Sequence, residues 1–268
     1  MIKSLDRITY LASSLEKAEK TFSSFFDLKP SKRVISTDKN YESLIYIFEN
    51  MCFEVIEKKD DLSEKNKLYG FSLLSDDLSS IISSMGDNWL PRINSDIFIE
   101  SEKNNRQEEF EDKVQSVKSI DIKQSPDFQL LVNEYENLDM DRANENNLFA
   151  LDHLVLTTNK SDDLINLYEK ELGIRLALDQ FVEKWGGRML FFRTGQATIE
   201  VIDNKVEGND QFWGLAWKTK DIRKKREYLV ENGFNVSDVK DGRKKDTLVA
   251  TVKFDEVKIP TLLVEHLK

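Results

Sequence analysis

His153 and Glu200 are the residues of this chain whose types and positions best combine for chemistry. An imidazole and a carboxylate can ligate a divalent metal, hydrogen-bond to a small molecule or transfer a proton. At a constant offset of 146 residues, the same positions earlier in the chain are Arg7 and Glu54. A guanidinium cannot ligate a metal and carries its own positive charge. The difference between Arg7 and His153 therefore indicates which part of the chain could hold a metal.

These positions belong to a long internal repeat. Residues 5–57 align with residues 151–203 without a gap. The first copy begins Leu-Asp-Arg-Ile-Thr-Tyr and the second Leu-Asp-His-Leu-Val-Leu, and both end in Glu-Val-Ile followed by an acidic residue. A shorter match places Tyr69-Gly70 on Trp213-Gly214. Self-similarity of this kind predicts a duplicated structural unit.

Each copy is predicted to form a βαβββ unit. A short strand with alternating apolar residues opens it, and three further strands close it. Between them, residues 14–26 and residues 161–172 carry apolar side chains at helical spacing, with Ser161 or Asp162 as the expected N-cap of the second helix. A weaker unit of the same order follows each copy, so we expect an α+β fold of four units.

Length and repeat together predict two domains. The chain of 268 residues is long enough for both, and residues 137–149 form a polar stretch rich in Asn and Asp, typical of a linker. We expect an N-terminal domain over residues 1–136 and a C-terminal domain over residues 150–268.

Composition narrows the partners and the compartment. The net charge of −10 argues against a nucleic-acid partner, which needs a basic face. No stretch approaches the roughly 18 apolar residues that span a membrane. Cys52 is the only cysteine and cannot form an intramolecular disulfide, which favours a cytoplasmic location. A homodimer is compatible with the sequence.

The paired βαβββ units, with Leu-Asp-His in a first strand and Ile-Glu-Val in a fourth, resemble the vicinal oxygen chelate superfamily. It includes glyoxalase I, bleomycin-resistance proteins and extradiol dioxygenases. The resemblance implies two cup-shaped mixed-sheet domains, with metal ligands projecting inward from the first and fourth strands. By position it makes His153 and Glu200 ligands in the C-terminal cup. In the next unit Gly214 stands where a histidine is expected, and Glu265 is the carboxylate nearest to the fourth position.

The resemblance thus implies that His153, Glu200 and Glu265, completed by water, hold one divalent ion of Fe, Mn, Ni, Co or Zn as a Lewis acid. Glu200 and Glu265 are the candidate catalytic residues, because a glutamate could also shuttle protons. The dioxygenase set of two histidines is incomplete, since His266 neighbours Glu265 and is expected on the opposite face. In the alternative interpretation, His153 hydrogen-bonds to Glu200 in a metal-free cup.

Other residues of the C-terminal half could contact a ligand. Gly214 is small enough to leave room for one, Trp213 supplies an aromatic surface, and Arg188 or Arg193 could pair with an anionic group. Trp217 is expected in the core.

The N-terminal cup has a different expected role. Arg7 and Glu54 would form an internal ion pair in place of a metal, so this cup would serve as scaffold.

Three functional hypotheses remain open, and whether the protein is an enzyme is among the open points. The first is a metal-dependent lyase, isomerase or oxygenase-like enzyme acting on a small oxygen-bearing substrate in the C-terminal cup. The second is a metal-free protein that sequesters a small molecule, as the bleomycin-resistance relatives do. The third is a degenerate pair of domains used for protein association.

Overall fold

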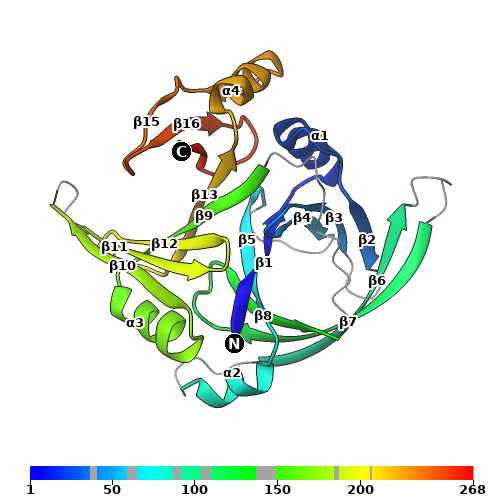
Figure 1. Cartoon of the computed structure of the whole chain (residues 1–268). Coiled ribbons are helices and arrows are strands. Elements are labelled where there is room, and N and C mark those ends of the chain that lie inside the picture. The colour runs from blue at the N-terminus through cyan, green and yellow to red at the C-terminus, as the bar shows by residue number, and fades with distance from the viewer. Residues whose placement is uncertain are drawn as a thin grey trace.

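The computed structural model describes residues 1–36, 41–58, 65–86, 92–103, 110–136, 149–183, 187–205 and 207–267. The chain forms two curved sheets, one from each half of the sequence (Figure 1). The α+β fold of four βαβββ units, paired into two cup-shaped mixed-sheet domains, is confirmed. Apart from Phe149, the expected linker lies outside the described residues.

The first half closes into a barrel with strand order β1-β4-β3-β2-β6-β7-β8-β5. Strand β1 runs parallel to β4 and antiparallel to β5, and β5 runs parallel to β8, so two units meet at β1 and β5. Pairing of β2 with β6 completes the closure. The elements are β1 (Ile2–Leu11), α1 (Leu15–Phe26), β2 (Lys32–Ser36), β3 (Tyr41–Ile47), β4 (Cys52–Lys58), β5 (Lys67–Ser75), α2 (Leu78–Ser84), β6 (Arg92–Lys103), β7 (Phe110–Ile122) and β8 (Gln129–Tyr135).

The second half repeats this order without closing. Its strands follow the order β10-β11-β12-β9-β13-β17-β16-β14, with β15 also paired to β16. In the described part of the chain β10 pairs only with β11, so this sheet is an open cup. The elements are β9 (Phe149–Thr158), α3 (Ser161–Ile165), the π-helix η1 (Asn166–Glu171), β10 (Arg175–Val182), β11 (Gly187–Thr194), β12 (Ala197–Asp203), β13 (Gln211–Thr219), α4 (Ile222–Glu231), β14 (Asn235–Val236), β15 (Lys240–Asp241), β16 (Thr247–Lys253) and β17 (Thr261–His266).

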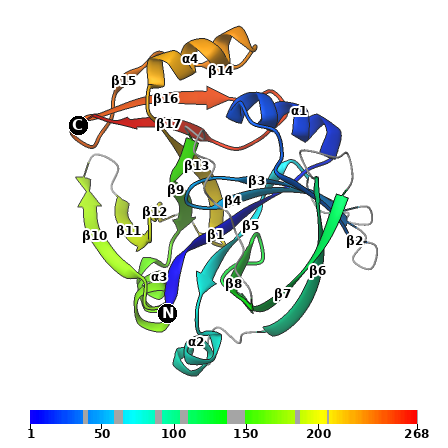
Figure 2. The ribbon, with the colours of Figure 1, turned by 45° about the vertical axis from the view of Figure 1, so that its right-hand side comes forward.

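One hydrophobic core spans both halves. Helix α1 buries Phe25 and Phe26 on its apolar face. The ring of Phe26 lies 4.9 Å from that of Trp217 on β13, and the ring of Phe25 lies 5.6 Å from that of Phe149 on β9. Figure 2 shows α1 beside the end of β16. The expected core position of Trp217 is found, with 2% of the residue exposed. No helix among the described residues is long and apolar enough to cross a membrane.

In each unit an acidic residue near the end of the fourth strand contacts the first residue of the helix. The first N–H groups of a helix lack partners within it, and the positive end of the helix dipole favours a carboxylate. In the fourth strand of one unit, Asp203 accepts a hydrogen bond from the Ser161 hydroxyl at 2.8 Å. Ser161 is the first residue of α3 and Lys160 is its N-cap, which corrects the expected N-cap. In the other three units a glutamate Oε2 accepts from the first backbone N–H of the helix: Glu57 from Leu15 at 2.8 Å, Glu134 from Leu78 at 2.7 Å and Glu265 from Ile222 at 2.9 Å.

Candidate functional site

His153 and Glu200 lie side by side on the concave face of the open cup. Their strands β9 and β12 run parallel, with Thr198 opposite His153. Leu154 and Val201 are fully buried in the core on the other face, so alternation turns His153 and Glu200 into the cup. The Nε2 atom of His153 lies 3.2 Å from Oε2 of Glu200, and the two side chains are 19% and 11% exposed. The structure therefore brings these two expected site residues together.

A β-bulge turns Asp152 toward the same face. On β9, His153 pairs with Ala216 of β13 and Leu151 pairs with Trp217, so Asp152 has no partner in the register. The extra residue of a bulge breaks the alternation of a strand and redirects a side chain. Two consecutive residues of β9 thereby contribute to one site.

Asp152 joins the only two histidines of the chain. Its Oδ1 lies 2.8 Å from Nδ1 of His153, and its Oδ2 lies 2.5 Å from Nε2 of His266. A continuous chain of polar contacts thus runs from Glu200 through His153 and Asp152 to His266. Sequence reasoning missed Asp152 and His266 as site residues. The sequence did contain a signal for Asp152, because an aspartate precedes the compared position in both copies of the repeat: Asp6 before Arg7 and Asp152 before His153.

Burial and hydrogen bonding move the two carboxylates in opposite directions. Burial alone would raise the pKa of Asp152, but hydrogen bonds from His153 and His266 outweigh it and lower the pKa to about 2. Burial raises the pKa of Glu200, and the charges of His153 and Arg243 offset this only in part. Asp152 therefore stays ionised and orients the two histidines, whereas Glu200 is the carboxylate of the site better suited to accept a proton.

Glu265 lies on the opposite face of the sheet from His153. Leu263 of β17 is fully buried in the core, and alternation puts Glu265 on that same side, where it caps α4 through Ile222. The neighbouring His266 consequently points into the cup. The expected set of His153, Glu200 and Glu265 is therefore not assembled, because burial of Leu263 sets the orientation of β17.

Close packing against the neighbouring backbone requires a glycine at position 214. A Cβ atom there would lie 2.7 Å from the carbonyl oxygen of Pro260, and one at the equivalent Gly70 would lie 2.4 Å from that of Gln129. The room expected for a ligand at Gly214 is thus taken up by backbone. Trp213, also expected at the ligand, falls at a register shift of β13 and is 49% exposed.

Of the two arginines expected at a ligand, Arg193 lies on the cup face. It pairs in register with Thr198 and donates from Nη1 to the Thr198 hydroxyl at 3.3 Å. Arg188 lies on the helix side. It donates to both carboxylate oxygens of Asp179, at 2.7 and 2.6 Å, and to Asp162 at 2.7 Å. Arg188 is therefore a structural residue outside the cup.

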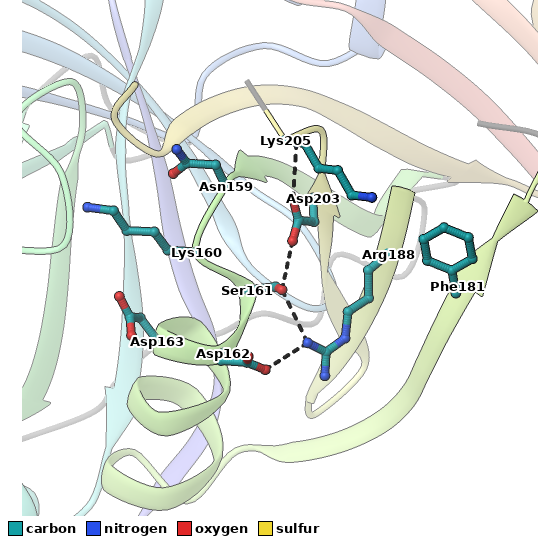
Figure 3. Close-up of a pocket in the computed structure, with 9 residues that line it drawn as sticks. All are labelled: Asn159, Lys160, Ser161, Asp162, Asp163, Phe181, Arg188, Asp203 and Lys205. Carbon is teal, nitrogen blue, oxygen red and sulfur yellow. Dashed lines mark hydrogen bonds and ion pairs between the residues drawn. The ribbon is translucent and has the colours of Figure 1, made fainter. Parts of the chain in front are cut away.

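The residues around Arg188 line a separate hollow of about 450 Å³ at the start of α3 (Figure 3). Figure 3 shows Arg188 directed at Asp162 and Ser161, and Ser161 directed at Asp203. These contacts tie β11 and β12 to the helix. The side chains that make these contacts thus serve the fold.

The donors in the cup do not fit a metal held by the protein alone. A bound zinc or similar ion takes three or four protein ligands. His153 and Glu200 offer two, while both oxygens of Asp152 contact histidines and Glu265 caps α4. Among the described residues no group of three or more His, Cys, Asp or Glu side chains could hold a metal ion. The arrangement fits a close contact between an imidazole and a carboxylate.

The expected ion pair is present in the N-terminal barrel. Nη1 of Arg7 donates to Oε2 of Glu54 at 3.0 Å. Burial would lower the pKa of Arg7, but the charge of Glu54 and other neighbours raises it well above its ordinary value. Arg7 is thus permanently charged and paired.

Asp6 in the barrel occupies the place of Asp152 in the cup. It too falls at a register shift, and it is fully buried. The close contacts of Gly70 with Gln129 and of Gly214 with Pro260 are equivalent in the two halves. Tyr135 follows Gln129 at the same spacing as His266 follows Pro260, so Tyr135 takes the place of His266. Oδ2 of Asp6 accepts hydrogen bonds from Ser72 at 2.9 Å, Asn133 at 2.8 Å and Tyr135 at 2.9 Å. The barrel interior therefore keeps the architecture of the site while its polar groups bond to one another.

Comparison with known proteins agrees with this geometry. Residues 152–251 match the family model of the Glyoxalase/Bleomycin resistance protein/Dioxygenase superfamily. No curated protein matches the chain significantly in sequence. A mutant of 4-hydroxymandelate synthase from Streptomyces coelicolor is similar with a TM-score of 0.72 and 11% identity, over 100% of this chain and 94% of that one.

Two further structures are similar over almost the whole chain. BphC, a halotolerant catechol dioxygenase, has a TM-score of 0.61 at 10% identity, covering 99% of this chain and 87% of that one. A hypothetical protein from Staphylococcus aureus has a TM-score of 0.60 at 8% identity, covering 98% and 99%. Residues 152–251 therefore resemble this superfamily in sequence, and the whole chain shares the two-domain fold of these solved structures. At such low identity these likenesses concern the fold alone, and an activity must be argued from the site.

Proposed function

We propose that the C-terminal cup binds a small oxygen-bearing molecule directly through His153 and Glu200, without a metal held by the protein. The observation that carries this proposal is the chain of contacts from Glu200 through His153 and Asp152 to His266. Nε2 of His153 and the carboxylate of Glu200 can each hydrogen-bond to a hydroxyl or carbonyl group. The chain behind them holds the imidazole in one orientation.

The unequal closure of the two sheets supports placing the ligand in the C-terminal half. In the N-terminal half β2 pairs with β6 and the sheet is a closed barrel, whereas the C-terminal sheet stays open at β10. Val155 of β9 and Phe191 of β11 are the residues paired with Glu200 on its two neighbouring strands, so their side chains lie on the same face as Glu200. They give the cup an apolar surface for the body of a ligand.

A second candidate function is proton transfer on the bound molecule, as in an isomerase or lyase. The raised pKa of Glu200 favours it, because a general base works best when its pKa approaches the ambient pH. Asp152 would hold His153 in place while Glu200 moves the proton. The metal-dependent version of this chemistry, with one divalent ion at His153 and Glu200, is the rival that metal analysis decides.

The proposal also includes two domains over residues 1–136 and 150–268 and a cytoplasmic location. Separate sheets in the two halves support the division. The single cysteine, Cys52, is buried and has no second cysteine to bridge, which supports a reducing compartment. Cell fractionation checks the location, and light scattering on the purified chain decides between monomer and homodimer.

The test is a screen of small oxygen-bearing molecules against the full chain by ligand-observed NMR. Wild type is compared with His153→Ala and with Lys160→Ala, which alters the hollow of Figure 3. We expect binding that is lost in His153→Ala and kept in Lys160→Ala. Loss in Lys160→Ala alone would assign the ligand to the hollow. No binding by any compound, together with a defined complex with another protein, would favour the association hypothesis.

Metal analysis of protein purified without chelator completes this test. Retention of about one Fe, Mn, Ni, Co or Zn per chain in wild type, and its loss in His153→Ala, would overturn the metal-free proposal. Binding of the small molecule at an unchanged affinity after chelator treatment would support it.

A further inference from the structure

Strand β10 is the edge of the C-terminal sheet. Through residues Arg175–Val182 it pairs with β11, and no other strand in the described part of the chain pairs with it. Figure 2 shows β10 at the outer margin of its sheet. An edge strand presents backbone N–H and C=O groups to any extended chain that can lie against it. The rim of the open cup therefore has the form of a strand-pairing site.

The internal repeat shows what lies at this position in the other half. With the offset of 146 residues, Leu178–Val182 corresponds to Lys32–Ser36, which is β2. Strand β2 pairs with β3 on one side and with β6 on the other, and the second pairing closes the barrel. At the place of β6, the C-terminal half has β14 and β15, which are two residues long each and pair with β16. Among the described residues, no strand therefore lies beside β10 as β6 lies beside β2.

The side chains of β10 favour contact with another strand over contact with water. Leu178 and Phe181 are 45% and 54% exposed. Leu178 pairs with Phe191 and so lies on the cup face, whereas Phe181 pairs with Arg188 and lies on the helix side. Edge strands are often protected by lysine or proline, and residues 175–182 contain neither. The edge thus exposes a large apolar side chain on each face of the sheet.

The charges of β10 suit an antiparallel copy of the same strand. Arg175 begins the strand, Glu183 follows its last residue, and both are exposed. When two such strands pair antiparallel, Arg175 of each copy lies at the end where the other copy has Glu183, which gives two pairs of opposite charge. Asp179 is the only charged residue between them, and Arg188 of the same chain donates to both of its carboxylate oxygens. The charge at the middle of the strand is therefore balanced before a partner arrives.

We propose that two copies of the chain form a homodimer by antiparallel pairing of their β10 strands, so that one sheet continues through both C-terminal cups. A two-fold axis relates the copies, since each presents the same edge to the other. Backbone hydrogen bonds fix the pairing, and Leu178 and Phe181 contribute the apolar surface that becomes buried. Leu178 lies on the cup face next to Phe191, so the partner strand lengthens the wall of the cup. The interface does not depend on which ligand the cup binds.

Sedimentation velocity of the full chain over a series of concentrations measures this association. Leu178→Lys places a charge on the edge, and Val230→Lys on α4 is its matched control, because Val230 is 46% exposed. Arg175→Glu and Glu183→Arg each set like charges against one another at the ends of the paired strands. The double variant Arg175→Glu with Glu183→Arg restores opposite charges. Circular dichroism verifies that every variant is folded.

We expect wild type and Val230→Lys to sediment with twice the chain mass of 31.2 kDa. Leu178→Lys should raise the dissociation constant of the dimer about tenfold or more, because two unpaired charges then lie in each interface. Each single charge reversal should raise it by a smaller factor, and the double variant should bring it back toward the wild-type value. Such a rescue reports contact between copies, which a change in the stability of one chain would not produce.

Three results would overturn the proposal. The first is a monomeric mass for wild type at every concentration. The second is a dimer whose dissociation constant is the same in Leu178→Lys as in wild type, which would place the interface elsewhere. The third is a double charge reversal that associates no better than the single ones, which would exclude the antiparallel pairing of β10 with its copy.

Discussion

The carboxylate of Glu265 accepts a hydrogen bond from the backbone N–H of Ile222 at 2.9 Å and so caps helix α4. Glu134 makes the same contact with Leu78 in the N-terminal half at 2.7 Å. Because the arrangement recurs in a half that lacks the histidine, it belongs to the fold. Glu265 is therefore a stabilising residue, and the chemistry of the cup rests on other side chains.

Replacing Glu265 with Ala should lower stability and leave ligand binding unchanged. Loss of a helix cap costs about 1 kcal/mol, which corresponds to a fall in Tm of roughly 2–4 °C for a protein of this size. Thermal unfolding measures the cost, and calorimetry with a ligand of the cup measures binding. Glu256→Ala is the control, because that side chain is 61% exposed. A tenfold loss of affinity in Glu265→Ala would return Glu265 to the site.

Asp152→Asn should make stability less dependent on acid pH. The pKa of Asp152 lies at about 2 in the folded protein against 3.8 ordinarily, so the group stabilises the fold fully above pH 3.8. This contribution disappears as the pH falls toward 2. Urea unfolding at a series of pH values should give a difference between wild type and Asp152→Asn that is present at pH 5, about one unit above the unfolded pKa, and shrinks as the pH falls below it. A difference that grows on acidification would contradict the assignment.

Breaking the ion pair in the barrel should cost more than removing both partners. Glu54→Gln leaves the Arg7 charge buried without its anion, a change that typically costs about 3–5 kcal/mol. The double variant Arg7→Met with Glu54→Met removes both charges and should recover much of that loss. Urea unfolding of the three proteins tests this. If the single and the double variant were destabilised equally, the two side chains would stabilise the barrel through their packing more than through the pairing of their charges.

Replacing each of the two tryptophans of β13 should change the free energy of unfolding by very different amounts. Trp217 packs against α1 and joins the halves, so Trp217→Ala should cost about 3–5 kcal/mol. Trp213 is 49% exposed, and Trp213→Ala should stay within about 0.5 kcal/mol of wild type.

Because one core spans both halves, wild type should unfold in a single transition when followed by fluorescence and by circular dichroism. Two separate transitions would show that the halves unfold independently.

The sequence anticipated much of the fold because the evidence for it is periodic. The gapless repeat and the apolar spacing of Phe22, Phe25 and Phe26 predicted paired units and the buried face of α1. The pairing of Arg7 with Glu54 and the approach of His153 to Glu200 followed from equivalent strand positions. Such features depend on residues that are close in sequence or related by the repeat.

The rest of the site depends on a bulge and on the orientation of one strand, and the alternation of residues along a strand predicts neither. A bulge at Asp152 places two consecutive residues on one face, and the burial of Leu263 turns Glu265 away from the cup and His266 toward it. A change of one residue in register exchanges the two faces of a strand, and long-range packing decides which register is taken. By itself the sequence determined that the halves are related and that His153 makes them chemically unequal. Only the tertiary structure decided which carboxylate supports His153, because that choice follows from how distant strands pack against one core.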